Sequence, residues 1–363
     1  MITDILERLV RAAGADPFRG AGEEIENFCR RIGLNLKRQP VREGLYNLIL
    51  PLGENPQVLI SAHFDTVPAV VEGRCARMGQ EGSRFYGRGS CDALGSIAAL
   101  LGTLQDLAEE GFDLKSSLVL IAFTVDEEEG GEGSVILQNI VPASIKWALV
   151  LEPTSLKLAL AEMGTLEYRV KIKGKTAHGS LPERGHNPLL MLFEVGSYLQ
   201  DLAGEFNRTF NPRIPLKFIP LKAVGGSEAL AIPGKAELKF DFRVPPEVPL
   251  SLLKGKIEEF FWKYPEIEFE VVEEAPPFQV EPASPFVEML ARIYEQELGH
   301  PLEFTFMPSW TDAHNFYEKG WLPVIWGPGD LAVAHTEEEH VEVAELLKAQ
   351  QFLTGLLRYL SQV

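Results

Sequence analysis

Four short apolar runs along the chain each lead toward a histidine or an acidic residue. They are Val58–Ala62, Ser117–Val125, Trp147–Leu151 and Leu322–Trp326. Near-continuous apolar runs of this length are typical of strands buried on both faces of a sheet. A further strand is expected near Tyr46–Leu50, two helices within residues 1–38, one helix along Ile97–Ala108, and a last helix from Val341 to Leu357. Strands that alternate with helices predict an α/β fold with a parallel-rich sheet flanked by helices.

Residues from about 165 to 275 show a different pattern. Thr165–Ile172 alternates apolar and polar residues, as a half-exposed strand does. More strands are expected near Leu216–Val224, Ala236–Val244 and Ile267–Val272, with helices near Asn187–Leu202 and Leu252–Tyr264. This pattern predicts a small α+β domain with its helices on one face. We expect it to be a lid or dimerisation domain, 165–275, inserted into a larger domain formed by 1–164 and 276–363.

Side chains that can bind a metal ion or exchange a proton lie at the ends of the predicted buried strands. His63 and Asp65 follow the first run, Asp126–Glu129 the second, Glu152 the third and His335 the fourth, while Asp92 precedes a predicted helix. Because the carboxyl ends of parallel strands meet at one edge of a sheet, these residues are expected to share one crevice. There His63 could bind a metal ion while Asp65 accepts its second ring N–H.

Each of these features has a simpler explanation when it is taken alone. An isolated His-x-Asp pair is more often a loop histidine followed by a capping aspartate. Asp92 alone suits a helix N-cap, and four consecutive acids are usually a solvated surface run. Repetition of the pattern at four strand ends favours a shared site instead. Two imidazoles and several carboxylates suit zinc or a similar divalent ion, and five such residues exceed one tetrahedral site. The pattern therefore indicates two ions, about 3.5–4 Å apart, that share a carboxylate.

Charge and cysteine content narrow the possible partners and location. The 363 residues suit two domains, and a net charge of -18 argues against binding to nucleic acid or to an anionic membrane surface. The three cysteines form no C-x-x-C pair, which favours a reducing compartment over a disulfide framework. No signal peptide and no apolar run of about 18 residues is found, so we expect a cytoplasmic protein.

Seven motifs, in order along nearly the whole chain, resemble those of the co-catalytic zinc hydrolases. This family includes acetylornithine deacetylase, succinyl-diaminopimelate desuccinylase, aminoacylase and carboxypeptidase G. The motifs are SAHFDTVP (61–68), YGRGSCDALG (86–95), TVDEEEGGEG (124–133), LEPT (151–154), GKTAHGSLPERGHNP (174–188), FDFRVPP (240–246) and GPGDLAVAHTEEEH (327–340). Any one of them is weak evidence, whereas seven in the family order are highly specific.

The resemblance implies a role for each matched residue. Asp92 would bridge two divalent ions, zinc or else cobalt or manganese. One ion would be completed by His63 and Glu152, and the other by Glu128 and His335. Glu127 would be the general base that takes a proton from the bridging water, and Asp65 would orient His63. From the lid, His178 would polarise the scissile carbonyl in the partner's site of a homodimer. Substrate contacts would come from Arg243, which binds a carboxylate, and from Asn187 and Gly327.

The implied reaction is hydrolysis of an N-acyl amino acid, and three departures from the family pattern bear on its substrate. Leu94, Leu230 and Ser309-Trp310 stand where members often have lysine, asparagine and glycine. The alternative is a carboxypeptidase or dipeptidase acting on a short peptide at the same site. An inactive binding homologue usually lacks some of the metal-binding residues, whereas all five expected metal ligands and Glu127 are present in this chain. A nucleotide-binding α/β protein is disfavoured because no G-x-G-x-x-G or Walker loop follows the first strand.

Overall fold

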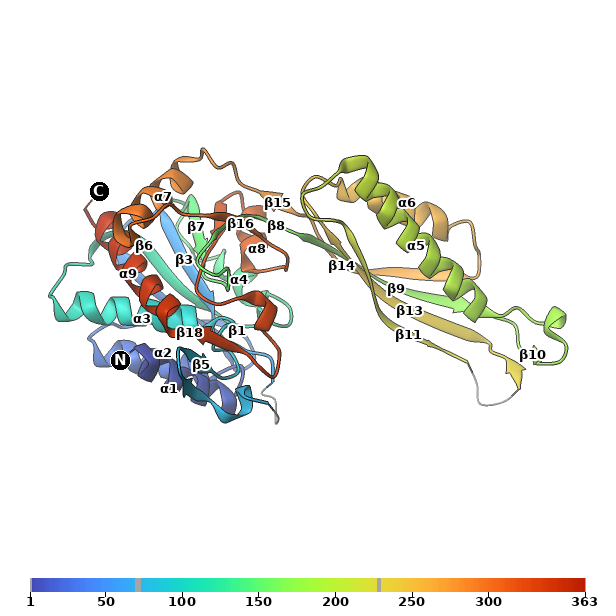
Figure 1. The fold of residues 1–363 in the computed structure, drawn as a ribbon, viewed down its shortest axis with the longest axis horizontal. Coiled ribbons are helices and arrows are strands. Elements are labelled where there is room, and N and C mark those ends of the chain that lie inside the picture. Colours follow the sequence, from blue (N-terminus) through green and yellow to red (C-terminus); the bar gives the residue numbers. More distant parts are fainter. Residues whose placement is uncertain (1, 69–72, 227–229, 363) are drawn as a thin grey trace. The chain divides into compact units, whose positions relative to one another are not determined.

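The computed structural model describes residues 2–68, 73–226 and 230–362. The chain forms two compact units. Unit 1 comprises Met1–Leu160, Val280–Met307 and Thr311–Val363, and unit 2 comprises Ala161–Gln279 and Pro308–Trp310. Figure 1 shows the elements of each unit. Within the described ranges, no helix is both long enough and apolar enough to span a membrane.

The largest sheet has a parallel centre. Its order is β1 (Lys37–Arg42), β2 (Leu45–Gly53), β6 (Ser116–Thr124), β3 (Val58–His63), β7 (Trp147–Val150), β17 (Leu322–Ile325), β8 (Leu158–Glu162) and β15 (Phe278–Gln279), and β16 (Phe304–Met307) also pairs with β8. The pairs β6–β3, β3–β7 and β7–β17 are parallel, whereas β1–β2, β2–β6, β17–β8 and β8–β15 are antiparallel. The parallel centre confirms the predicted α/β fold.

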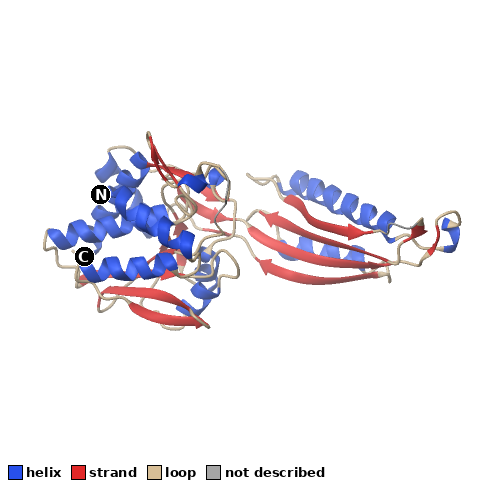
Figure 2. Ribbon diagram, turned by 90° about the horizontal axis from the view of Figure 1, so that it is seen from below, coloured by secondary structure: helices blue, strands red, loops and turns tan. Residues whose placement is uncertain are grey.

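Helices cover this sheet in two groups. The first group is α1 (Ile2–Ala15), α2 (Gly20–Arg31), α3 (Leu94–Glu109), α7 (Pro285–Leu298) and α9 (Val343–Leu360), and the second is α4 (Glu132–Leu137) and α8 (Asp312–Glu318). All six residues of β3 are buried. Because successive side chains of a strand point to opposite faces, both faces of β3 are covered. Figure 2 distinguishes these helices from the strands by colour.

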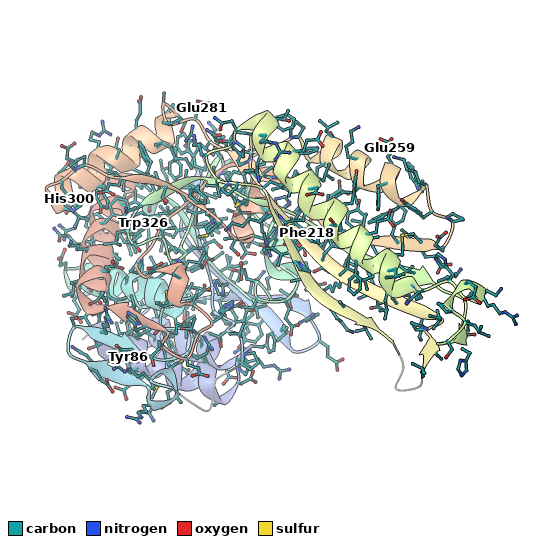
Figure 3. The ribbon with its side chains drawn as sticks, turned by 45° about the vertical axis from the view of Figure 1, so that its right-hand side comes forward. Tyr86, Phe218, Glu259, Glu281, His300 and Trp326 are labelled. Atoms are coloured by element: carbon teal, nitrogen blue, oxygen red, sulfur yellow. The ribbon has the colours of Figure 1, made fainter. Side chains whose placement is uncertain are left out.

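Aromatic side chains join the first helix group to the sheet. The ring of Trp326, labelled in Figure 3, lies 4.6 Å from the ring of Phe352 in α9, centroid to centroid. Its indole N–H donates to the main-chain oxygen of Leu156 at 2.9 Å. Beside this core lies a three-stranded sheet of β4 (Gly79–Glu81), β5 (Arg84–Tyr86) and β18 (His340–Glu342). One-turn 3₁₀ helices lie at Cys75–Arg77 and Leu331–Val333.

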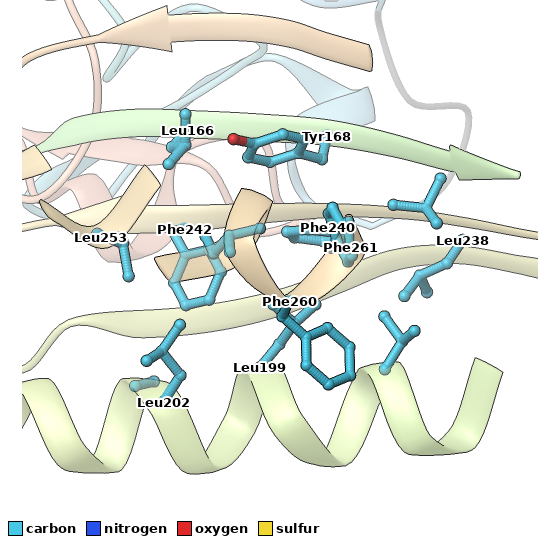
Figure 4. Close-up of a cluster of buried hydrophobic side chains, with 14 of the residues drawn as sticks. Leu166, Tyr168, Leu199, Leu202, Leu238, Phe240, Phe242, Leu253, Phe260 and Phe261 are labelled. Carbon is cyan, nitrogen blue, oxygen red and sulfur yellow. The ribbon is translucent and has the colours of Figure 1, made fainter. Parts of the chain in front are cut away.

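Unit 2 is an antiparallel sheet packed against two helices. The strand order is β11 (Lys217–Gly225), β13 (Lys235–Val244), β9 (Gly164–Lys173) and β14 (Ile267–Ala275), and β10 (Ala177–His178) pairs with β12 (Ala231–Ile232). Helices α5 (Pro188–Phe210) and α6 (Leu250–Phe261) contribute to one buried cluster with alternate residues of β9 and β13. Figure 4 shows Tyr168, Phe240 and Phe242 in this cluster. Because strand side chains alternate, Asp241 and Arg243 lie on the opposite face of β13.

Three details differ from the sequence-based expectation. Val341 lies in strand β18, opposite Phe85 of β5, and not in the last helix. Helix α5 continues to Phe210, where Asn211 adopts a left-handed conformation with φ of 43° and ends it. The short strands β1, β4, β5, β8, β15 and β16 were not expected, because each is too short or too mixed in polarity to give a periodic signal.

Candidate metal centre

The parallel strands bring the predicted ligands to one edge of the sheet. His63 ends β3 and is in register with Thr124, which ends β6. Glu128 lies four residues after Thr124, and Glu152 lies two residues after the end of β7. Asp92 precedes α3, and His335 follows the 3₁₀ turn beyond β17. The residues therefore meet because parallel strands end together, although 272 positions separate the first from the last.

Asp92 is the centre of this cluster. Its Oδ1 lies 3.0 Å from Nε2 of His63, and its Oδ2 lies 3.5 Å from Nε2 of His335. Glu152 approaches His63 Nε2 at 3.7 Å, and Glu128 approaches His335 Nε2 at 3.1 Å. The two oxygens of one carboxylate thus face two different histidines, and each histidine has a second carboxylate beside it.

The chemistry of these donors fits divalent cations. Ligand atoms of His63, Asp92 and Glu128 all lie within 4.8 Å of one another. Oε1 of Glu152 is buried and has no hydrogen-bond partner among the residues that the structure describes. A buried carboxylate oxygen without a donor is costly, and a cation would satisfy it. Imidazole nitrogens together with carboxylate oxygens are the ligand set that zinc and similar ions prefer.

The cluster is strongly coupled electrostatically. Hydrogen bonds to Asp92 and Glu128 raise the pKa of His335 to about 10, although burial opposes the change. Burial would raise the pKa of Asp92, but hydrogen bonds from His335 and His63 hold that pKa well below its usual range. Burial raises the pKa of Glu152 far above its usual value. The carboxylates and imidazoles of the cluster therefore shift one another's pKa values in opposite directions.

Glu127 adjoins the predicted ligand Glu128 and is itself a candidate for proton transfer. Burial raises the pKa of its carboxyl well above the ordinary value, the charge of His63 opposes this, and the nearby Glu152 adds to it. The main-chain N–H of Glu127 points to Asp65 Oδ1 at 3.4 Å, and that of Glu128 to Asp65 Oδ2 at 3.2 Å. Asp65 therefore holds the main chain of both glutamates.

The interpretation of the acidic run as a solvated surface segment is wrong for Asp126 and holds only for Glu129, whose side chain is 57% exposed. Asp126 is buried, has φ of 74° and forms an ion pair with Arg42 at 2.5 Å. Asn47, fully buried in β2, accepts from the N–H of Val125 at 3.2 Å and donates to the main-chain oxygen of Gly133 at 2.9 Å. A left-handed non-glycine residue persists only where its surroundings hold it, and here two side chains from β1 and β2 do so.

The orientation of His63 differs in one detail from the expected one. Its Nδ1 lies 3.0 Å from the main-chain oxygen of Asp65 and 3.7 Å from the carboxylate. A carbonyl oxygen can only accept, so Nδ1 carries a proton. In the charged ring Nε2 donates to Oδ1 of Asp92, whereas in the neutral ring Nε2 would present its lone pair to a metal ion. Asp65 orients His63 chiefly through its main chain.

Local geometry bears on two further expectations. The N-cap of α3 is Ala93 without a side-chain cap, so the N-cap alternative for Asp92 is wrong. Gly327 donates its N–H to Thr154 Oγ1 at 3.0 Å and accepts from the N–H of Leu156 at 2.8 Å. A Cβ there would lie 2.7 Å from the main-chain oxygen of Glu152. Gly327 thus permits close packing beside a ligand, and its substrate contact stays a prediction.

Asp312 is a buried carboxyl that sequence reasoning missed. It follows the N-cap of α8 and accepts from Thr124 Oγ1 at 2.7 Å. Burial raises its pKa to about 6. The Thr-Asp pair at 311–312 is the only sequence signal, and it suits an ordinary helix start equally well.

The remaining predicted residues belong to unit 2. His178 is exposed in β10, and its Nδ1 accepts from the N–H of Ser180 at 3.2 Å. Asn187 caps α5, accepting from the N–H of Leu189 at 3.1 Å. Arg243 pairs through Nε with Oδ2 of Asp241 at 2.8 Å. Asp241 is buried and also accepts from Thr165 Oγ1 at 2.6 Å.

Comparison with known proteins shows the family of this chain. A model of peptidase family M20/M25/M40 matches residues 59–359. The chain belongs to this family. As an M20/M25/M40 member it is an enzyme with metal-dependent hydrolytic function, and the resemblance inferred from its motifs is confirmed.

Its relatives in the family have more than one activity in their names. The chain is 26% identical over 343 residues to an acetylornithine deacetylase of Pectobacterium atrosepticum, covering 90% of this chain and 87% of the relative. It is 26% identical over 350 residues to a probable carboxypeptidase of Aspergillus clavatus, covering 91% and 81%. A tripeptidase from Staphylococcus aureus has the same fold, with a TM-score of 0.82 and 18% identity over 100% of this chain and 98% of that one.

Replacing Asn47 with alanine tests how the acidic turn is held. The change leaves the N–H of Val125 and the oxygen of Gly133 without their side-chain partner. We expect the free energy of unfolding, measured in urea, to fall by about 1–3 kcal/mol. Asn27→Ala is the control, because the exposed side chain of Asn27 accepts a hydrogen bond from Arg30 at 3.2 Å on the surface of α2. Its effect should stay within about 0.5 kcal/mol. Equal effects of the two substitutions would contradict the bracing role.

Proposed function

We propose that this chain hydrolyses the amide bond of an N-acyl amino acid, using water activated at two divalent ions. The observation that carries the proposal is the position of Asp92, whose two oxygens face two separate histidine–carboxylate pairs. The ions would be held by His63, Asp92 and Glu152 on one side, and by Asp92, Glu128 and His335 on the other. We favour zinc, with cobalt or manganese as alternatives.

The chain's own groups supply the proton transfers. Two bound ions would lower the pKa of a water molecule and polarise the scissile carbonyl. Glu127, whose pKa burial raises, accepts a proton from the attacking water and returns it to the leaving amine. The carboxylate of Asp65 accepts from the N–H groups of Glu127 and Glu128 and so fixes both main chains. The side chain of Glu128 would then bind metal, while that of Glu127 stays free to transfer a proton.

Unit 2 offers groups suited to the substrate. Because Nδ1 of His178 accepts from Ser180, the neutral ring carries its proton on Nε2, which is the donor that a developing oxyanion needs. Asp241 engages Arg243 through Nε, which orients the guanidinium for a bidentate contact with a substrate carboxylate. Leu230 is 76% exposed, and its main-chain oxygen accepts from Gly179, next to His178. Its apolar side chain favours a less polar substrate.

A peptidase acting at the same site is the second candidate. A deacetylase and a probable carboxypeptidase match this chain at the same 26% identity, so identity does not separate them. Both reactions hydrolyse an amide and release an amine. We further propose a cytoplasmic location, which the buried, unpaired Cys29, Cys75 and Cys91 support.

Measurement of amine release tests the function directly. Zinc- or cobalt-loaded protein is incubated with N-acetyl and N-succinyl amino acids of different side chains and with dipeptides. We expect turnover of N-acyl amino acids, and Glu127→Gln, which keeps the side-chain size but accepts no proton, should lower kcat by about 10²-fold or more with both ions retained. Faster cleavage of dipeptides would favour the peptidase, and unchanged turnover in Glu127→Gln would refute the general base.

We also propose that the chain is a homodimer joined through unit 2. Leu190 and Phe193 on α5 are each 66% exposed, and Leu221 and Val224 on the edge strand β11 are about half exposed. The start of α5 lies against the end of β11, since a Cβ on Gly225 would lie 2.7 Å from Leu189. Exposed apolar patches and unpaired strand edges of this kind suit a second copy of the same surface.

Mixing two inactive variants tests the dimer and the role of His178 together. We expect His178→Ala and Glu127→Ala each to lose activity, by about 10²–10³-fold for the histidine. After subunit exchange, half of the dimers are mixed and each has one complete site, so up to about a quarter of wild-type activity should return if His178 acts in the partner. Phe193→Asp in both chains is the control that should abolish recovery. Proven exchange without recovery would exclude action between subunits.

A further inference from the structure

A buried ion pair joins the two segments that carry Asp92 and His335. Arg88 is 6% exposed and Glu339 is fully buried, and the guanidinium Nη1 of Arg88 donates to Oε2 of Glu339. The two residues meet because β5 and β18 pair, with His340 opposite Tyr86. The main chains stay together beyond that pair, since the N–H of Gly87 donates to the oxygen of Glu339 at 3.3 Å.

Each residue of the pair forms hydrogen bonds to the main chain of the proposed metal ligand on the other segment. Glu339 lies four residues after His335, and its Oε1 accepts from the N–H groups of Cys91 at 3.2 Å and Asp92 at 3.4 Å. Arg88 lies four residues before Asp92, and its Nη2 donates to the main-chain oxygen of His335 at 3.3 Å. The contacts are therefore reciprocal, although about 250 positions separate the two segments along the chain (Asp92 to Glu339 spans 247).

The stability of the fold alone does not account for this pair. A buried ion pair is often no more stabilising than apolar residues of the same volume, because both charges lose their hydration. Burial raises the pKa of Glu339 to about 7, the charge of Arg88 lowers it, and the nearby carboxylate of Asp92 raises it further. His335 has φ of 62°, a left-handed conformation that a non-glycine residue keeps only where its surroundings hold it.

We propose that Arg88 and Glu339 are positioning residues that set the distance between Asp92 and His335, and through it the affinity for the ion that His335 holds. The proposal rests on the metal centre described under Proposed function. Neither side chain has to touch an ion. Arg88 holds the main-chain oxygen of His335, while Glu339 holds the main-chain N–H of Asp92, so Oδ2 of Asp92 and Nε2 of His335 stay 3.5 Å apart.

The test separates positioning from stability with two variants. Arg88→Met leaves Glu339 buried without its counter-charge, so the melting temperature of the metal-free protein should fall. In the double variant Arg88→Met/Glu339→Gln no unpaired charge remains, and the amide oxygen can still accept from Cys91 and Asp92. Its melting temperature should recover toward wild type. The donor to His335 is absent in both variants.

The metal-free proteins are then titrated with Co²⁺, and calorimetry and visible absorption measure the affinity for each ion. We expect wild type to bind two ions, and both variants to bind the second ion about 10- to 100-fold more weakly, as loss of an outer contact to a ligand usually does. Glu342→Gln is the control. Glu342 pairs with Arg84 at 2.6 Å across the same strands, away from both ligands, and should leave both affinities unchanged.

Each outcome is decisive. Binding of fewer than two ions by wild type would refute the proposed metal centre and this inference with it. Two ions in wild type, together with wild-type affinity in a double variant that has recovered its melting temperature, would overturn the positioning role alone. A weakened second ion in that recovered variant, with normal binding in Glu342→Gln, would establish the positioning role of Arg88, whose donor to His335 is the contact removed.

Discussion

The concentration of carboxylates at one sheet edge is the constraint on which unit 1 depends. Asp65, Glu127, Glu128 and Glu152 lie within a few residues of the ends of parallel strands, and Asp92 joins them from the segment before α3. Buried carboxylates need donors or positive charge, and without them they take up protons instead. Hydrogen bonds from His63 and His335 serve Asp92, and main-chain N–H groups serve Asp65. Glu152 Oε1 accepts no hydrogen bond among the described residues and has only the His63 ring near it, at 3.7 Å, so a cation would fit there.

The surrounding structure can be understood as the means of keeping these charges in place. Left-handed conformations at Asp126 and His335 turn the main chain sharply beside the cluster. Asn47 holds the first of these turns from β2, and Arg88 holds the second from the segment after β5. Asn47 and Arg88 are themselves almost completely buried. Water therefore competes little for their hydrogen bonds.

Much of this arrangement could be predicted from the sequence, because the signals are local. Continuous apolar runs identified β3, β6, β7 and β17, and the residues after them identified the cluster. The bracing contacts carry no such signal. Glu339 stands in the run Glu337–Glu339, which looks like a solvated surface segment, yet Glu339 is fully buried while its two neighbours are exposed. The pairing of β5 with β18, far apart in the sequence, brings Glu339 to its partners. Strands this short give no periodic signal in the sequence. The main-chain contact of Asp65 with His63 was missed for a related reason, since side-chain identity says nothing about main-chain acceptors.

The central claim is that one carboxylate, Asp92, serves two ions. Diffraction from crystals of the zinc-loaded protein, recorded on both sides of the zinc absorption edge, tests it most directly. We predict two anomalous peaks about 3.5–4 Å apart, each about 2.0–2.2 Å from a different oxygen of Asp92. One peak should also be bound by His63 and Glu152, and the other by Glu128 and His335. A single peak, or two peaks of which only one contacts Asp92, would contradict the account.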